Sequence, residues 1–259
     1  MAGNNHKQSG LKNEQHKKKL IFFDFFYDYK FKSLSIYETY CVITKTPCII
    51  VGNTGSGKSE AYNFLKQNFK DVMPFNTMTM ASLKHIASEI SNYNGIIFVD
   101  DIGAINTEYM RITTMTTLVY LAYQHNLKRL DVNSNFEIRN FNGSLIINIQ
   151  PEIFNEIVSN ASFEANIMDK TYRYYNMRMA DNEPFEHPKI KGLDSIRANF
   201  DKIKIDIDKH KVETLANAFL NYNSPARRYK IVYNFVKLTA MFNNHKEAKS
   251  EDYNFVSKL

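Results

Sequence analysis

The chain has 259 residues, of which 44% are hydrophobic and 23% are charged, and its formal net charge is +6. This composition suits one α/β domain with a smaller second domain, and it excludes a membrane-spanning protein because no apolar run reaches the length that a bilayer requires. Residues 1–19 lack the hydrophobic stretch of a signal peptide, and Cys41 and Cys48 form no disulfide framework or metal-binding spacing. We therefore expect a cytoplasmic protein without zinc, haem or iron–sulfur.

The charge is unevenly distributed along the chain. Residues 1–20 carry a net charge of +4, residues 21–188 carry −4, and residues 189–259 carry +6. Any electrostatic affinity for nucleic acid would therefore lie in the N-terminal tail and the C-terminal part, although ordinary solvated faces explain the same distribution. The tail, residues 1–19, is polar and has no periodicity, so we expect it to be disordered.

The next segments predict the start of a folded domain. An aromatic stretch over residues 20–27 is expected to pack back on the domain, because exposed it would favour aggregation. Residues 33–44 predict a helix, Cys48–Val51 predicts a short buried strand, and residues 58–69 predict a second helix.

A glycine-rich segment joins that strand to the second helix. It matches the phosphate-binding pattern G-x-x-x-x-G-K-[ST] at every position. Its glycines allow backbone N–H groups to surround a di- or triphosphate, and the helix N-terminus adds its positive dipole end. Lys58 would reach the β- and γ-phosphates, and the Ser59 hydroxyl would bind Mg²⁺. The predicted nucleotide-binding residues are Gly52, Asn53, Thr54, Gly55, Ser56, Gly57, Lys58, Ser59 and Glu60.

Strands and helices then alternate, which predicts a three-layer α/β domain with a parallel sheet. After residue 188 the pattern becomes all-helical, with apolar residues at helical spacing over 212–220 and 231–242 and a last helix starting near Ser250. We thus predict a tail (1–19), a nucleotide-binding domain (20–188) and a small helical lid (189–259). Within the α/β domain the predicted elements are a weak strand at 71–75, a helix at 80–91, a strand at 96–100, a helix at 107–124, a hairpin at 128–141, a strand at 144–149, a helix at 151–158 and a strand at 172–179.

Two carboxylates end the apolar strand that begins at Ile96. Asp100 is placed to orient Mg²⁺ and its water shell, and Asp101 is placed to orient or deprotonate the attacking water. The spacing from the phosphate loop leaves room for one intervening strand in the sequence. We expect the two strands that carry the site to be neighbours in the sheet.

With these two motifs the chain resembles the AAA+ ATPases over residues 33–259. Gly52–Ser59 matches Walker A, and Ile96–Asp101 matches Walker B. An Asp-Asp pair followed by Ile-Gly is similar to initiators and helicase loaders of the DnaA, DnaC and IstB kind. In that comparison Asp101 stands where a glutamate usually activates water, and the shorter side chain implies slower turnover.

The resemblance also implies residues that sense the γ-phosphate. Residues 144–151 resemble the sensor 1 strand, in which Gln150, before Pro151, is the first candidate to help place the water and Asn148 is the alternative. Residues 169–173 resemble the segment that supplies an arginine finger to a neighbouring subunit, with Arg173 as the first candidate and Arg178 as the alternative.

The lid resembles that of MCM-type and MoxR-type proteins. Residues 224–228 read Ser-Pro-Ala-Arg-Arg, and Arg227 matches the sensor 2 arginine that touches the γ-phosphate. This match places Ala240 on the small residue of that lid and Asp252 at its last helix start. A cation at a helix start is unfavourable for the helix dipole, which favours a functional role.

The resemblance therefore implies an enzyme that hydrolyses Mg²⁺-bound ATP, forms a homo-oligomer, and acts on DNA or on a DNA-bound protein partner, with no role for a membrane. Lys128, Arg129 and Arg139 in the hairpin are candidate DNA contacts. A nucleotide-gated binding switch with little hydrolysis and a MoxR-like protein remodeller stay open as alternatives. A small-molecule kinase fits less well, because a separate helical lid follows the last strand.

Overall fold

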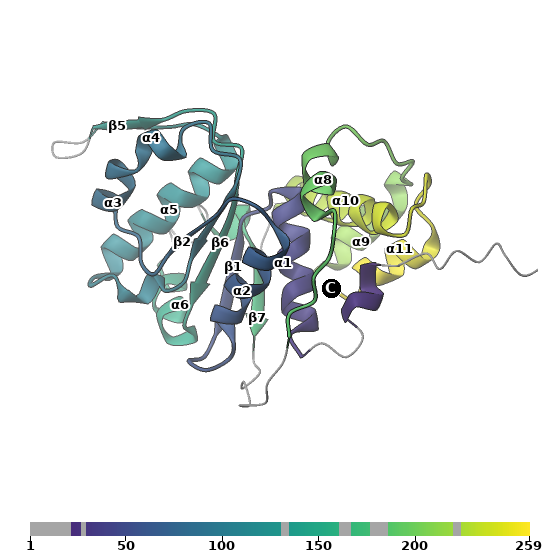
Figure 1. The fold of residues 1–259 in the computed structure, drawn as a ribbon, viewed down its shortest axis with the longest axis horizontal. Coiled ribbons are helices and arrows are strands. Elements are labelled where there is room, and N and C mark those ends of the chain that lie inside the picture. Colours follow the sequence, from purple (N-terminus) through teal and green to yellow (C-terminus); the bar gives the residue numbers. More distant parts are fainter. Residues whose placement is uncertain (1–21, 27–29, 131–134, 161–166, 177–185, 220–223) are drawn as a thin grey trace, which may run out of the picture.

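A computed structural model describes residues 22–26, 30–130, 135–160, 167–176, 186–219 and 224–259. Its centre is a parallel sheet of five strands in the order β2-β3-β6-β1-β7 (Figure 1). The predicted α/β fold with a helical C-terminal region is confirmed. The strands of this sheet are β1 (Cys48–Gly52), β2 (Val72–Phe75), β3 (Ile96–Val99), β6 (Ser144–Ile149) and β7 (Tyr172–Asn176).

Successive residues of a strand point to opposite faces of the sheet. In this sheet both sets are apolar, and helices cover both faces. One face packs on α1 (Lys32–Thr44) and α2 (Lys58–Asn68) through side chains such as Ile50 and Phe98. The other face packs through side chains such as Ile49 and Ile97. Its helices are α3 (Met80–His85), α4 (Ala87–Ile90), α5 (Glu108–Gln124) and α6 (Pro151–Val158).

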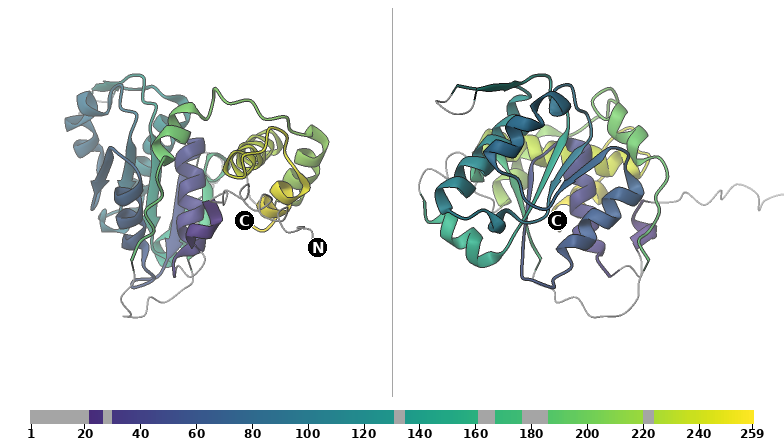
Figure 2. Two further views of the ribbon diagram at one scale, coloured as in Figure 1. Left: turned by 45° about the vertical axis from the view of Figure 1, so that its right-hand side comes forward. Right: turned by 60° about the vertical axis from the view of Figure 1, so that its left-hand side comes forward.

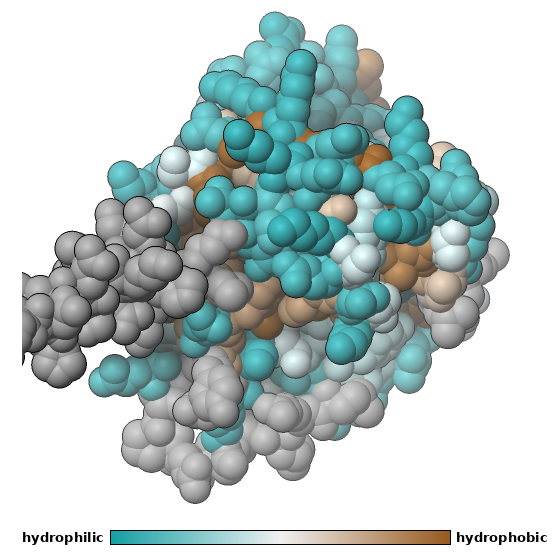
Figure 3. Space-filling model, turned by 90° about the vertical axis from the view of Figure 1, so that its right-hand side faces the viewer, coloured by the Kyte–Doolittle hydropathy of each residue, from teal (hydrophilic) through white to brown (hydrophobic). Residues whose placement is uncertain are grey.

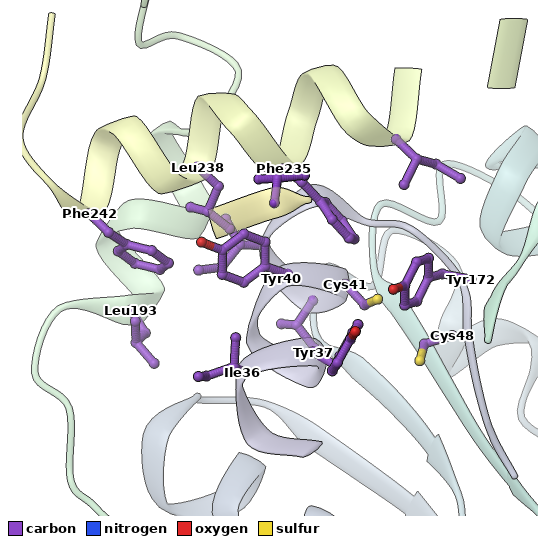
Figure 4. Packing of buried hydrophobic residues seen from close by; sticks show 14 of the residues in the cluster. Ile36, Tyr37, Tyr40, Cys41, Cys48, Tyr172, Leu193, Phe235, Leu238 and Phe242 are labelled. Atoms are coloured by element: carbon purple, nitrogen blue, oxygen red, sulfur yellow. The ribbon is translucent and has the colours of Figure 1, made fainter. Parts of the chain in front are cut away.

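The C-terminal helices pack on the side of α1 that faces away from the sheet (Figures 1 and 2). Tyr40 of α1 shares a 2.7 Å hydrogen bond with Thr239 of α10, and its ring meets Phe235 edge to face. Figure 4 shows these aromatic side chains between the two helices. One hydrophobic core therefore runs from the sheet into the C-terminal helices. These are α8 (Leu193–Asn199), α9 (Lys209–Ala218), α10 (Pro225–Phe242) and α11 (Ser250–Val256).

The aromatic stretch packs on this same core, as expected. It forms the short helix η1 (Phe22–Phe26), in which Phe22 stacks on Phe242 with ring centroids 3.8 Å apart. Phe23 packs on Phe255 of α11 at 4.2 Å. The start of the described chain is thus tied to its end.

Two sequence-based expectations need correction. The strands that carry the site are not neighbours, because β6 lies between β1 and β3 and pairs with both. The helix expected over residues 80–91 is interrupted at Ile86. The last helix begins at Ser250, as predicted, and the Asp252 carboxylate accepts a 2.8 Å hydrogen bond from the backbone N–H of Lys249 at its start.

The predicted hairpin is confirmed as β4 (Leu127–Arg129) paired antiparallel with β5 (Phe136–Ile138). Two of its three candidate DNA contacts are engaged within the chain. The Arg129 guanidinium donates to Thr117 at 3.3 Å, and Arg139 forms a 2.7 Å ion pair with Glu137. Lys128 is exposed.

Figure 3 views the molecule from the side of the C-terminal helices. Hydrophilic residues cover most of this face, and hydrophobic residues show mainly in the hollows between them. Cys41 and Cys48 are buried and do not form a disulfide, consistent with a structural role. None of the helices in the described ranges combines the length and the apolar character that crossing a membrane requires.

Glu38 on α1 predicts a pH-dependent stability. It is fully buried, and neither carboxyl oxygen has a hydrogen-bond partner among the described residues. Burial raises the pKa of this carboxyl well above its ordinary value, with a smaller contribution from Cys48. As pH rises past the ordinary value, the unfolded chain releases this proton while the folded chain keeps it, so folding stability falls.

We expect Glu38→Gln to raise the free energy of unfolding at pH 8 and to change it little at pH 4, where Glu38 is protonated in both states. Urea unfolding at the two pH values measures this difference. An equal effect at both pH values would show that Glu38 is ionised to the same extent in the folded and unfolded chain.

Candidate functional site

The glycine-rich loop lies at the carboxyl end of β1, where α2 begins. Gly55 and Gly57 have φ values of +78° and +81°, a left-handed conformation that glycine adopts without strain. A Cβ atom at Gly57 would lie 2.2 Å from the Phe31 ring, so the position has no room for a side chain. The loop shape thus depends on glycine at these positions.

Lys58 folds back over the loop. Its ammonium donates hydrogen bonds to the carbonyl oxygens of Gly52 and Asn53, the latter at 2.8 Å. Partial burial lowers the pKa of Lys58, and the carboxylates of Asp101 and Asp100 offset part of that effect. The cation is therefore held at the mouth of the loop, next to the two acidic residues.

Three strand ends bring the predicted metal-binding groups together. The Ser59 hydroxyl lies 3.4 Å from a carboxylate oxygen of Asp100, at the end of β3. The same oxygen accepts a 3.1 Å hydrogen bond from the side-chain amide of Asn148 on β6. Asn148 also contacts the Lys58 carbonyl at 3.3 Å. Because β6 lies between β1 and β3, the Asn148 side chain on β6 links the phosphate loop to Asp100 at the end of β3.

Asn148 and Gln150, the two sensor 1 candidates, differ in their contacts. The Asn148 side chain is fully buried, and its Oδ1 has no hydrogen-bond partner among the described residues. A buried acceptor without a partner is costly, so this oxygen suits a water or metal-bound water. Gln150 follows the strand and precedes α6, and its side chain does not cap that helix.

These groups fit Mg²⁺, which prefers hydroxyl, carboxylate and water oxygens. Ser59 and Asp100 supply the first two, and the Asn148 side-chain amide contacts the same Asp100 oxygen. The residues present are thus those that a Mg²⁺-bound triphosphate requires.

The remaining loop-side residues have other contacts. One Asp101 oxygen accepts a 2.8 Å hydrogen bond from the Gly103 N–H, which caps the short helix η2 (Ile102–Ala104). Glu60 pairs with His187 at 3.0 Å. Asn53 and Thr54 are exposed. Asp101 and Glu60 are therefore partly committed to structural contacts in this state.

Two residues near the loop were missed in the sequence. Phe31 packs against Gly57, and Asn176 at the end of β7 donates a 2.8 Å hydrogen bond to the Ser56 carbonyl. The sequence signal was a polar residue within the predicted last strand. Finding it required knowing that β7 pairs with β1 and places Asn176 opposite Gly52.

Arg173 is not placed as an arginine finger. It lies inside the sheet layer on β7, is 7% exposed, and donates a 3.3 Å hydrogen bond to the Met168 carbonyl. A finger must project from its own subunit, whereas this guanidinium is enclosed by it. The alternative, Arg178, lies outside the described residues.

Arg227 is likewise not at the phosphate loop. It forms an ion pair with Asp169 and lies over the Tyr123 ring at 5.1 Å. It lines a cavity together with Thr46 and Pro47, which precede β1. The loop follows β1, so Arg227 lies at the opposite end of that strand and does not act as a sensor of this subunit's γ-phosphate.

This position leads to a prediction for Arg227→Ala. We expect ATP affinity to stay within about twofold, while the free energy of unfolding falls by about 1 kcal/mol, because a partly buried ion pair and a cation–π contact are lost. An ATP titration and a urea unfolding curve measure the two effects. A tenfold loss of ATP affinity with unchanged stability would restore the sensor assignment.

Comparison with known proteins supports the fold. No protein-family model matches the sequence, and no curated protein matches it. One similar solved structure is the 2.00 Å crystal structure of a "putative ATPase" from Cytophaga hutchinsonii ATCC 33406. It shares 15% sequence identity with this chain, and the match covers 88% of this chain and 80% of that one with a TM-score of 0.55. At this identity the likeness establishes a shared fold.

Proposed function

We propose that this protein binds Mg²⁺-bound ATP at Gly52–Ser59 and hydrolyses it as a AAA+ ATPase. The observation that carries the proposal is the convergence of Lys58, Ser59, Asp100 and Asn148 where three parallel strands end. The sheet order, in which β6 separates the two motif strands, supports it. The similar fold of a protein described as a "putative ATPase" is consistent with it.

Each residue has a defined task in this proposal. The loop N–H groups and Lys58 hold the phosphates, and Ser59 with Asp100 holds Mg²⁺. When bound, Mg²⁺ supplies positive charge that neutralises the β- and γ-phosphate oxygens. Asn148 accepts a hydrogen bond from water through its free oxygen, and Asp101 orients the attacking water through the oxygen that does not cap η2.

A nucleotide-gated switch is the second candidate, and Asp101 favours it. Its carboxylate is shorter than the glutamate of comparable sites, and one of its oxygens already accepts from Gly103. A water-activating base that serves as a cap has less freedom to reach a water molecule. In this version ATP would drive assembly or client binding, with slow turnover.

We propose a homo-oligomer with a finger arginine supplied between subunits, of which Arg178 is the surviving candidate. Action on DNA or a DNA-bound partner would depend on the basic terminal parts, since Arg129 and Arg139 are engaged within the chain. A MoxR-like remodeller would instead act on protein.

ATP turnover across protein concentration, with and without single- or double-stranded DNA, tests these versions, with Lys58→Ala as the blank. Turnover that rises with protein concentration supports the oligomeric ATPase, and a further rise with DNA supports a DNA client. Binding of ATP without turnover above the blank favours the switch. Absence of both binding and turnover rejects the proposed function.

A further inference from the structure

The phosphate loop is fixed from the side by a residue of the edge strand. Asn176 ends β7 and is 3% exposed. Its side-chain amide donates a 2.8 Å hydrogen bond to the backbone carbonyl of Ser56, in the middle of the loop. The two residues are 120 positions apart in the sequence, so this contact exists only because β7 pairs with β1.

The contact determines which way one peptide group faces. The peptide bond between Ser56 and Gly57 is trans, so its carbonyl and its N–H point in opposite directions. Asn176 draws the Ser56 carbonyl toward β7. The Gly57 N–H must then point away from β7, toward the concave side of the loop where a phosphate would accept it.

The bond from Asn176 is the described contact that orients this peptide group, whereas its neighbours are held by the Ser56 N–H donating to the Asn53 carbonyl at 3.1 Å and the Glu60 N–H donating to the Gly57 carbonyl at 3.0 Å. Gly55 and Gly57 flank Ser56, and both have positive φ values, so the local backbone has little intrinsic preference. A reversed peptide would place a carbonyl oxygen where the phosphate lies, and two negative groups would repel. The Ser56 side chain is buried and does not lock the peptide, since its hydroxyl has no hydrogen-bond partner among the described residues.

The surrounding packing indicates a built contact. A Cβ atom on Gly52 would lie 2.9 Å from the Asn176 carbonyl oxygen and 2.7 Å from the Ser56 hydroxyl. The loop thus folds closely over the end of β7. Phe31 encloses Gly57 from another element, so the peptide is held between a hydrogen-bond donor and an aromatic ring.

We propose that Asn176 is a positioning residue that presents the Gly57 N–H to the phosphates of a bound nucleotide. This inference rests on the proposed nucleotide-binding function. It assigns to the edge strand a part in phosphate binding that neither sequence motif contains. Because the Gly57 N–H belongs to the part of the loop that surrounds the α- and β-phosphates, the effect belongs to binding of ATP and ADP alike.

Two variants separate positioning from packing. Asn176→Ala removes the donor, and Asn176→Asp keeps the size but replaces the donor with an acceptor that repels the Ser56 carbonyl. We expect the dissociation constants for Mg²⁺-bound ATP and ADP to rise about tenfold in the first variant and further in the second. In turnover, KM should rise while kcat at saturating ATP changes less than threefold. Asn217→Ala, on the exposed face of α9, is the matched control.

The outcomes are distinct. If Asn176 only fills space, Asn176→Asp keeps wild-type affinity, and that result overturns the proposal; so does Asn176→Ala binding within twofold of wild type. Should either variant fail to fold, Asn176→Ser, which keeps a donor, must retain more affinity than a folded Asn176→Val. A wild-type protein that binds neither ATP nor ADP better than Lys58→Ala would instead reject the nucleotide site itself.

Discussion

Replacing Lys58 with alanine is expected to weaken binding of ATP and ADP by about 100-fold while leaving the fold intact. The Lys58 ammonium is held over the loop by the Gly52 and Asn53 carbonyls, and a charged donor to a phosphate contributes more than a neutral one. Partial burial lowers the pKa of Lys58, and the carboxylates of Asp101 and Asp100 offset part of that effect. Titration with a fluorescent ATP analogue measures the loss.

Lys66 provides the matched control for this experiment. It lies in the last turn of the same helix, over the Tyr62 ring at 5.9 Å, and is exposed. Lys66→Ala removes the same charge from α2 but lies away from the loop, so ATP affinity should match that of the wild type. Equal losses in the two variants would mean that general charge, and not the loop geometry, attracts the nucleotide.

Replacing Asp100 with asparagine should remove the Mg²⁺ dependence of ATP binding and lower turnover by about 100-fold. Asp100 accepts from Ser59 and Asn148 through one oxygen, which leaves the other for the water shell of the metal. Changing even the groups that support metal ligands typically costs 10–100-fold in metal affinity or activity, so loss of a carboxylate proposed to hold Mg²⁺ should cost at least as much. Parallel ATP titrations with Mg²⁺ and with EDTA measure the effect.

Asp201→Asn serves as the control, because its side chain is 82% exposed on the C-terminal part. It should keep the wild-type response to Mg²⁺. If Asp100→Asn also kept that response, the metal would be held by groups other than those at the end of β3, and the magnesium assignment would be lost.

Local patterns in the sequence were sufficient to predict the strands of the sheet. The alternation of apolar strands with helices predicted all five strands, and the loop pattern located Lys58 and Ser59 at the start of α2. These features depend on neighbours in the sequence. The order of the strands depends on pairing between distant segments, which is why β1 and β3 were wrongly expected to be adjacent.

Arg173 and Arg227 do not lie where their motif matches predicted, for a similar reason. The motif matches that selected Arg173 and Arg227 carry no information on burial. Arg173 is enclosed because Met168 in the preceding turn covers it, and Arg227 is drawn to Asp169 and Tyr123 by the packing of α10 on α1. Both outcomes depend on how the side chains pack: Arg173 is covered by a residue five positions earlier in the chain, and Arg227 pairs with Asp169, which is distant in the sequence.

The resemblance left Asn148 and Gln150 open, because Asn148 is a common sensor residue type whereas Gln150, before Pro151, matches the sensor position. The structure separates them by where the strand ends. β6 ends at Ile149, so Asn148 is held in the sheet between the two motif strands while Gln150 starts the turn into α6. Asn148 contacts Asp100, and we therefore propose it, rather than Gln150, for the sensor role.

Isothermal titration calorimetry of the wild-type protein with ATP, in Mg²⁺ and in EDTA, tests the central claim most directly. The account predicts one ATP per chain, an affinity at least tenfold higher in Mg²⁺, and no measurable heat with Lys58→Ala under the same conditions. Binding that is absent in the wild type, or equally strong in Lys58→Ala, would show that Gly52–Ser59 and Asp100 do not form a magnesium–nucleotide site.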